Sequence, residues 1–203
     1  MIVIVDYGMG NLASIKNMVH HLGHESIISG DVSVIEQADK LFLPGVGHFK
    51  NAITSIDELE LRTVIDKKAL EDKVPILGIC LGMQLLTDYS EEGDVNGLGY
   101  IHAQTRKFSF KNNELKVPHM GWDYVEWLKE DPLLEGMTDE DRFYFVHSYY
   151  VKCDSEANSL GRTDYGMVFD SVIKNDNVIG TQFHPEKSHK FGMKLMRNFL
   201  ENY

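Results

Sequence analysis

The sequence predicts a three-layer α/β domain with a mostly parallel central sheet that is extended by antiparallel strands. Three observations support this fold class. Short apolar runs alternate with amphipathic stretches in the first half, which is typical of βα units around a parallel sheet. After about residue 98, apolar and polar residues alternate in steps of two, as in antiparallel strands. No linker, low-complexity tract or internal repeat divides the chain, so we expect a single domain over residues 1–203.

The first half contains the expected βα units. Residues 2–5 form an apolar run that ends at Asp6, and residues 12–22 place Leu12, Ile15, Val19 and Leu22 on one helical face. Further elements are expected at 26–29 (strand), 41–43 (strand), 59–70 (helix), 74–79 (strand) and 81–89 (helix).

The second half is expected to supply the antiparallel strands and a closing helix. Asn175-Asp176-Asn177 is typical of a hairpin turn. Strands are expected at 117–127, 143–151, 168–174 and 178–183, and a helix at 188–200 with Phe191, Leu195 and Phe199 on one side.

Composition excludes several classes of protein. Twenty basic and 31 acidic residues give a net charge of −11, which disfavours binding to nucleic acid or anionic membranes and suits a complementary protein partner. The longest apolar stretch, residues 74–83, is well short of the roughly 20 residues that span a bilayer. The amino terminus lacks the basic start of a signal peptide, and two cysteines are no disulfide framework. We therefore expect a cytoplasmic protein.

Cys80 lies in Gly-Ile-Cys-Leu-Gly (78–82), between an expected strand and an expected helix. A glycine-flanked residue at such a turn is typical of a nucleophile elbow, which presents the side chain at the carboxyl end of a strand. The start of the following helix favours a thiolate. The alternative is a buried structural cysteine in a tight turn. Cys153 follows an alternating run without such a turn, which favours a structural role.

A cysteine nucleophile needs a base, and the base needs an orienting group. Of nine histidines, only His184 has a carboxylate placed for this role, in Gln-Phe-His-Pro-Glu (182–186). Pro185 favours an extended backbone at His184, so that His184 and Glu186 project to the same side. The alternative is a chance pair at a strand end. Together with the elbow, the pattern favours a triad of Cys80, His184 and Glu186.

An oxyanion hole is the third requirement of such a site. The N–H of Leu81, directly after the nucleophile, is one candidate donor. The turn Pro-Gly-Val-Gly (44–47) follows an expected strand, and its glycines allow a backbone N–H to turn toward the site. Gly45, Val46 and Gly47 are therefore candidates for the second donor, unless the segment is an ordinary glycine-rich turn.

A second glycine motif points to another class of protein. Gly-Met-Gly-Asn-Leu-Ala (8–13), with Asp31 further along, has the outline of a dinucleotide-binding fingerprint, so a nucleotide-binding oxidoreductase acting through Gly8 and Gly10 is an alternative. The sequence has no Gly-Lys-Ser/Thr phosphate loop and no Cys/His cluster with metal-ligand spacing. We expect no metal and no cofactor.

Several motifs together resemble the class I, triad-type glutamine amidotransferases. They are Gly-Ile-Cys-Leu-Gly-Met-Gln-Leu-Leu (78–86), Leu-Pro-Gly-Val-Gly (43–47) and Gln-Phe-His-Pro-Glu-Lys-Ser (182–188). Within that class, residues 6–12, 116–122 and 143–149 are similar to the glutaminase subunits of imidazole glycerol phosphate synthases. The resemblance runs in consistent order over residues 1–203 and implies a flavodoxin-like fold.

The resemblance implies a role for each matching residue. Cys80 attacks the side-chain amide of glutamine, His184 protonates the departing ammonia, and Glu186 holds His184. Water then hydrolyses the glutamyl thioester. Gly45, Val46 and Gly47 form the oxyanion loop by similarity. The resemblance further implies that the amino-acid end of glutamine is bound by Gln84, Glu92, Ser148 and Tyr149. Glu92 equally fits a solvated helix end.

The resemblance also implies a heterodimer with a TIM-barrel cyclase subunit. Ammonia passes to the cyclase, which forms imidazole glycerol phosphate and the aminoimidazole carboxamide ribonucleotide of histidine biosynthesis. The residues implied at this interface are Asn11, Met120, Trp122, Tyr144 and Lys187, although core packing is an alternative for Tyr144.

One departure from the family pattern keeps other acceptors open. The family pattern usually ends Gly-Trp-Asn, whereas this chain has Asp123 after Trp122. The added charge near the expected interface suits a differently charged partner, so one alternative is a paralogous glutaminase that feeds another acceptor system, such as surface-sugar amidination. A non-catalytic binding subunit that keeps the fold is a further alternative.

Overall fold

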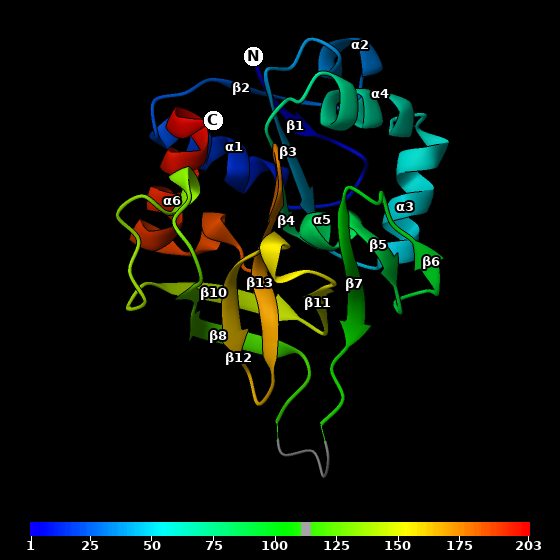
Figure 1. Ribbon diagram of the computed structural model, residues 1–203. Helices are drawn as coiled ribbons and strands as arrows, with labels where there is room; N and C mark the ends of the chain where they lie inside the picture. Colours follow the sequence, from blue (N-terminus) through cyan, green and yellow to red (C-terminus); the bar gives the residue numbers. More distant parts are fainter. Residues whose placement is uncertain (111–114) are drawn as a thin grey trace.

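The computed structural model describes residues 1–110 and 115–203 and has the expected α/β architecture (Figure 1). Its large sheet begins with five parallel strands in the spatial order β2 (Ser26–Ser29), β1 (Ile2–Val5), β3 (Lys40–Gly45), β4 (Ile76–Cys80) and β14 (Val178–Thr181). The sheet continues through β13 (Val168–Asn175), β11 (Tyr149–Cys153), β7 (Ile101–Lys107), β5 (Thr87–Ser90) and β6 (Val95–Asn96), of which only β5 and β7 pair in parallel. The strands β12 (Ser159–Asp164) and β9 (Glu126–Trp127) extend it beside β13.

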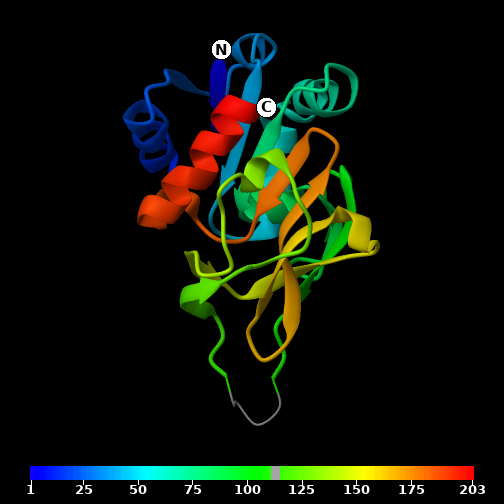
Figure 2. The ribbon, with the colours of Figure 1, turned by 60° about the vertical axis from the view of Figure 1, so that its left-hand side comes forward.

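Helices cover both faces of the parallel strands (Figure 2). On one face lie α1 (Leu12–His21) and α6 (His189–Asn202). On the other lie α2 (Val32–Ile35), α3 (Phe49–Glu58), α4 (Arg62–Asp66) and α5 (Leu81–Leu85), with a π-helical turn at Lys67–Glu71. Strand β1 shows why two cores form, because Val3 and Val5 pack into one apolar cluster and Ile4 into the other.

A separate two-stranded ribbon, made of β8 (His119–Tyr124) and β10 (Arg142–His147), lies at the carboxyl ends of β4 and β14 (Figure 1). Three short 3₁₀ segments complete the described structure: Pro132–Leu134, Glu156–Asn158 and Pro185–Lys187. The segment Pro185–Lys187 links β14 to α6 and carries Glu186. The ribbon and this link therefore enclose the edge of the sheet at which Cys80 lies.

Most predicted elements are confirmed within a few residues, but two helices and two strands differ from the prediction. The predicted helix 59–70 is wrong at its start, because α3 ends at Glu58 and Glu60 has a left-handed φ of 57°. The predicted helix 81–89 stops at Leu85, since Thr87–Ser90 pairs with β7 as strand β5. The predicted strands 117–127 and 143–151 are each divided into two, and the second break, at Ser148, separates the ribbon strand β10 from β11.

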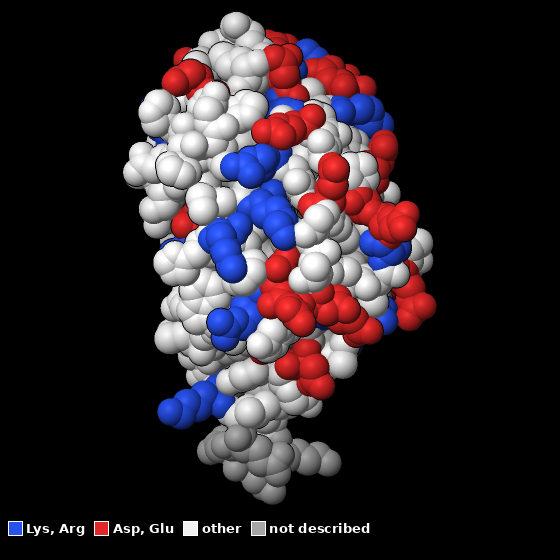
Figure 3. Space-filling model, turned by 90° about the vertical axis from the view of Figure 1, so that its left-hand side faces the viewer, with Lys and Arg blue, Asp and Glu red and all other residues white. Residues whose placement is uncertain are grey.

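The acidic net charge is not spread evenly over the surface. On the face shown in Figure 3, Lys and Arg side chains gather near the middle, with acidic side chains beside and below them. Exposed basic residues Lys190 and Arg197 project from α6. Within residues 1–110 and 115–203, no helix is both long and apolar enough to cross a bilayer.

Candidate active site

Cys80 stands at a strained turn between β4 and α5. Its backbone adopts φ 55° and ψ −108°, a combination that costs a non-glycine residue about 1–3 kcal/mol and is common at functional sites. The turn is packed tightly against β3, because a Cβ added to Gly82 would lie 1.7 Å from the Leu43 carbonyl oxygen. A Cβ added to Gly78 would lie 2.7 Å from the carbonyl oxygen of Gly82. Both flanking glycines are thus required, and the predicted elbow geometry is present.

His184 and Glu186 form a buried pair beside this turn. The Nδ1 of His184 lies 2.8 Å from Oε1 of Glu186, and both side chains are 1% exposed. His184 is extended, with φ −99° and ψ 97°, and Pro185 begins the following 3₁₀ turn. Burial disfavours the charged imidazole, but its contacts with Cys80 and Glu186 outweigh this effect and raise the pKa of His184 to about 10. Its Nε2 is buried and makes no hydrogen bond with the described residues.

The ribbon strand β10 contacts both members of the reactive pair. The Val146 carbonyl oxygen lies 3.9 Å from Sγ of Cys80, and the backbone N–H of His184 donates to the Tyr144 carbonyl oxygen at 2.9 Å. Tyr144 is itself held, because its N–H donates to Oγ of Ser188 at 3.0 Å. The position of β10 therefore determines where the thiol and the imidazole lie relative to each other.

Cys80 and His184 open into a cavity of about 380 Å³, a volume suited to a small ligand. Seven other predicted site residues line it: Val46, Gly47, Leu81, Gln84, Glu92, Ser148 and Tyr149. Gly45 lies just behind the wall, paired with Cys80 across β3 and β4, and Glu186 lies behind His184. The structure thus brings the predicted catalytic, oxyanion and substrate residues to one place.

The candidate oxyanion loop ends β3 beside the nucleophile. The N–H of Leu81 belongs to the first turn of α5, where a helix provides no internal partner. Gly47 has a φ of 115°, which glycine adopts readily. Tyr7 anchors the loop, because its hydroxyl donates a hydrogen bond to the Pro44 carbonyl oxygen. Burial, with a smaller effect of Cys80, raises the pKa of Tyr7, so this hydroxyl keeps its proton.

Polar side chains connect the cavity wall to the nucleophile. The Nε2 of Gln84 donates to the Tyr149 carbonyl oxygen and to Oε1 of Gln182, at 3.1 Å each. Gln182, which is fully buried, in turn directs its Nε2 to Sγ of Cys80 at 3.8 Å. Glu92 is not part of a solvated helix end, because its Oε2 accepts a hydrogen bond from the backbone N–H of Phe49 at 2.8 Å.

Four of the five predicted interface residues share one surface beside the cavity. Trp122 and Tyr144 face each other across the ribbon with ring centroids 6.1 Å apart, and Nζ of Lys187 lies 6.0 Å from the Tyr144 ring. Met120 and Trp122 are 61% and 43% exposed, which is unusual for large apolar side chains. Asn11 is exposed at the start of α1, next to Gly10, which packs on Pro44.

Sequence reasoning missed Pro118, Val146 and His147 of the cavity wall, and it missed the contact of Gln182 with the thiol. His147 lies within the motif 143–149, but it has no carboxylate two residues away and was set aside for that reason. The signal that identifies these residues is three-dimensional, since β10 is held beside the cavity by its pairing with β8 and by backbone contacts with His184 and Ser188.

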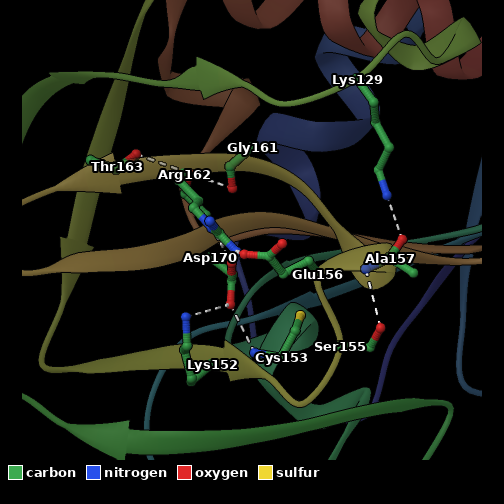
Figure 4. Close-up of polar contacts among 11 residues, drawn as sticks. Lys129, Lys152, Cys153, Ser155, Glu156, Ala157, Gly161, Arg162, Thr163 and Asp170 are labelled. Atoms are coloured by element: carbon green, nitrogen blue, oxygen red, sulfur yellow. Dashed lines mark hydrogen bonds and ion pairs between the residues drawn. The ribbon is translucent and has the colours of Figure 1, made fainter.

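Cys153 belongs to a separate cluster of polar contacts with Asp170 and Arg162 (Figure 4). Its backbone N–H donates to the buried Asp170 at 2.8 Å, and Asp170 also pairs with Nε of Arg162 at 3.0 Å. Burial and the Asp170 charge raise the pKa of the Cys153 thiol to about 12. A thiol that stays protonated is a poor nucleophile, which agrees with the predicted structural role.

The residues of the glycine motif near the amino terminus (8–13), and Asp31 beyond it, have structural roles. Gly8 and Gly10 have left-handed φ values of 83° and 112°. Asp31 caps α2 by accepting the N–H of Ser33 at 2.8 Å, so its carboxylate is occupied. Within the part of the chain that the structure describes, no group of three or more His, Cys, Asp or Glu side chains is arranged to hold a metal ion.

Comparison with known families identifies relatives over almost the whole chain. The model of the family described as glutamine amidotransferase class-I matches residues 3–203. A Methanococcus maripaludis protein named imidazole glycerol phosphate synthase subunit HisH 2 is 52% identical over 201 residues, covering 99% of each chain. The subunit HisH of Sulfurimonas denitrificans is 49% identical over 204 residues, covering 99% of this chain and 98% of the relative.

Solved structures show the same fold at low sequence identity. A structure described as glutamine amidotransferase superimposes with a TM-score of 0.75 at 21% identity, covering 98% of this chain and 97% of the other. The structure of PurLQS from Thermotoga maritima gives a TM-score of 0.75 at 18% identity, with 99% and 97% covered. The fold class predicted from the sequence is confirmed.

Proposed function

Since this chain belongs to the class-I glutamine amidotransferase family, we propose that it is the glutaminase subunit of an imidazole glycerol phosphate synthase in histidine biosynthesis. Full-length relatives at 52% and 49% identity carry that subunit name, which supports the assignment. The observation that carries the chemistry is the presence of Cys80 and His184 in the wall of one cavity at the end of the sheet, with Glu186 bound to His184 from behind.

In this proposal Cys80 is the nucleophile. Its thiol proton passes to Nε2 of His184 while Sγ attacks the side-chain amide carbon of glutamine, so that a C–S bond forms and the carbonyl electron pair moves onto the oxygen. His184 then delivers a proton from Nε2 to the amide nitrogen, the C–N bond breaks, and ammonia leaves. Water attacks the glutamyl thioester, gives its proton to His184, and the C–S bond breaks to release glutamate. Glu186 binds Nδ1 throughout, which keeps Nε2 directed at the reacting atoms.

The backbone around Cys80 supplies the oxyanion hole in this account. Leu81 lines the cavity and begins α5, so its N–H is the first donor, and Gly45, Val46 and Gly47 at the end of β3 offer a second N–H. A loop that contains two glycines reorients a peptide at little cost, which suits a donor that is completed when a partner binds.

The amino-acid end of glutamine is proposed to lie against Gln84, Glu92, Ser148 and Tyr149. Glu92 supplies the charge that an α-ammonium group requires. One of its oxygens is used by the Phe49 N–H, and the other is available to the ligand. Binding of the substrate ammonium therefore uses a carboxylate that is already fixed at the start of α3.

The surface made by Met120, Trp122, Tyr144 and Lys187, together with Asn11, is proposed to bind a cyclase subunit with a TIM-barrel fold. An exposed apolar patch with a basic residue at its edge is typical of a protein interface. Asp123 gives no support to a different acceptor, because its carboxylate is directed inward to His119 rather than toward the patch. A cytoplasmic location is part of the proposal, since Cys80 and Cys153 are both free thiols.

The test is the replacement Cys80→Ala in the assembled complex. Glutamine-dependent turnover is expected to disappear, whereas turnover with added ammonium salt is expected to persist, because the acceptor chemistry belongs to the partner. Full glutaminase activity in Cys80→Ala would refute the role of Cys80. A complex that forms imidazole glycerol phosphate from neither nitrogen source, with the wild-type chain present, would refute the proposed acceptor.

A further inference from the structure

A buried amide lies directly behind the nucleophile. Gln182 follows the last residue of β14, and Thr181 pairs with Ile79 in the parallel register, so Gln182 and Cys80 are neighbours at the ends of adjacent strands. Gln182 is fully buried, and its Nε2 lies 3.8 Å from Sγ of Cys80. Among the described residues, those that line the cavity do not include Gln182. Gln182 therefore contacts the nucleophile from behind the cavity wall.

Hydrogen bonds determine which end of this amide faces the sulfur. The Tyr149 carbonyl oxygen only accepts, so Gln84 directs the NH₂ group of its amide at it, at 3.1 Å. The same NH₂ group lies 3.1 Å from the side chain of Gln182, which must therefore present its oxygen, Oε1. The NH₂ group of Gln182 is left to face Sγ of Cys80. In this contact the amide donates and the sulfur accepts.

The chain of amides is anchored in the surrounding backbone. The Tyr149 carbonyl oxygen also accepts from Nδ1 of His147 at 2.7 Å. The backbone N–H of Gln182 donates to the Ser171 carbonyl oxygen at 2.8 Å, and Gln84 is 4% exposed. Buried amides keep the partners that the protein supplies, because losing one leaves a polar group without water to replace it. The direction of the Gln182 amide is therefore set.

Two polar contacts of the sulfur have opposite effects on its charge. The Val146 carbonyl oxygen, at 3.9 Å from Sγ, accepts the proton of a thiol, whereas the NH₂ group of Gln182 donates. Once the thiol proton has passed to His184, the sulfur carries negative charge. The carbonyl dipole disfavours this charge, and a hydrogen bond from Gln182 stabilises it. Gln182 thus favours the form of Cys80 that attacks a substrate.

We propose that Gln182 is a positioning residue for the nucleophile, whose buried amide holds Sγ of Cys80 and stabilises the sulfur after its proton has left, in a direction set by Gln84. This inference rests on the proposed glutaminase function. It also gives Gln84 a second role beside substrate binding. Both N–H groups of the Gln84 amide are used within the protein, so Gln84 presents its oxygen to a ligand.

The test measures how fast iodoacetamide alkylates Cys80 in the full-length chain at a fixed neutral pH, followed by peptide mass spectrometry. Iodoacetamide reacts with the deprotonated sulfur and does not need the glutamine pocket. Gln182→Met keeps a side chain of similar length but has no N–H group. Alkylation of Cys80 is therefore expected to slow about fivefold, the effect of one lost hydrogen bond. An unchanged rate would overturn the inference.

A second substitution tests the role of Gln84 in this chain. Gln84→Met removes the donor that sets the direction of the Gln182 amide, so it should also slow the alkylation of Cys80. Because the two amides act on the sulfur through one contact, adding Gln84→Met to Gln182→Met should slow alkylation no further. Two independent effects that multiply in the double variant would contradict the proposed chain.

The matched control is Thr181→Val. Thr181 precedes Gln182, is fully buried, and donates from Oγ1 to the Phe183 carbonyl oxygen at 3.2 Å. Its replacement also removes one buried hydrogen bond and should leave the alkylation rate of Cys80 at the wild-type value. An equal slowing in Thr181→Val would overturn the inference, because general loosening of this segment would then explain both results. Labelling of the buried Cys153 reports such loosening in every variant.

Glutamine hydrolysis by the assembled complex separates this inference from the proposed function. Gln182→Met is expected to lower kcat about fivefold and to change KM less, because Gln182 contacts the nucleophile and lies behind the cavity wall. A loss confined to KM would contradict the positioning role. Absence of glutaminase activity in the wild-type complex, with the alkylation rates as expected, would instead refute the proposed function.

Discussion

The tight contact between Gly82 and β3 makes Gly82→Ala an informative perturbation of the nucleophile elbow. A Cβ at this position would lie 1.7 Å from the Leu43 carbonyl oxygen, about half an ordinary contact distance, and the opposing atom is backbone. The start of α5 must therefore move away from β3, by roughly 1.5 Å, to relieve the overlap. Because Leu81 and Cys80 directly precede Gly82, the oxyanion donor and the nucleophile move with it.

The expected magnitude combines two opposing effects. Overpacking of this severity costs about 3 kcal/mol, and replacing a helical glycine by alanine returns about 1 kcal/mol. We expect a net loss of about 2 kcal/mol in the free energy of unfolding, measured by urea denaturation. A displacement on the order of 1 Å at the reacting atoms should lower kcat for glutamine hydrolysis about 100-fold.

The control for this variant is Gly23→Ala. Gly23 has no neighbouring atom within 4 Å of an added Cβ, although its φ of 87° is left-handed. Its replacement should cost about 1–2 kcal/mol through backbone strain and leave kcat unchanged. If Gly82→Ala has the same midpoint of urea unfolding as the wild type and retains the wild-type kcat, tight packing at Gly82 does not position the elbow.

Three further variants test other parts of the site. Glu186→Gln should lower kcat by about 10³- to 10⁴-fold. Without the carboxylate the pKa of His184 falls from its raised value of about 10, so the alkaline limb of the pH–rate profile should move to lower pH; an unmoved limb contradicts the pairing. Arg162→Gln leaves the buried Asp170 without its closest cation and should lower the free energy of unfolding by about 3 kcal/mol with little change in kcat. Cys153→Ser should leave kcat unchanged, and a large loss of kcat would show that Cys153 takes part in the reaction.

The nucleophile Cys80 and the pair of His184 and Glu186 could be predicted from the sequence because each is marked by a short local motif. Each signal lies within a segment of five residues. Glycines stand two positions before and two positions after Cys80, and a carboxylate stands two positions after His184. The glycines matter for the reason that the pattern suggests, since the backbone of β3 leaves no room for a Cβ at Gly82.

Helix α3 and strand β5 were missed for different reasons. Helix α3 buries Phe49, Ala52, Ile53 and Ile56 in a regular helical pattern, but the sequence analysis placed no helix over these residues and expected one at 59–70 instead. Strand β5 continues directly from α5, and its pairing with β7 is what turns residues 87–90 away from a helix. Local propensity does not contain the pairing of β5 with β7, so tertiary contacts decided the conformation of residues 87–90.

The cavity wall shows the same limit at the level of single residues. His147 reaches the cavity because β8 and β10 pair as a ribbon, and Gln182 reaches Sγ of Cys80 because β14 lies beside β4. Substrate residues such as Ser148 and Tyr149 were predicted by family resemblance rather than by spacing. Resemblance identified the residues, and the fold explains how segments 60 or more positions apart act together.

Covalent labelling with an electrophilic analogue of glutamine tests the central claim most directly. The chain, with its partner subunit present, is treated with the analogue and mapped by peptide mass spectrometry. We expect one label per chain, on Cys80, that free glutamine suppresses and that Cys80→Ala abolishes, with Cys153 unmodified because its thiol stays protonated. An unlabelled Cys80, or a label on Cys153 in its place, would contradict the assignment of Cys80 as the nucleophile of a glutaminase.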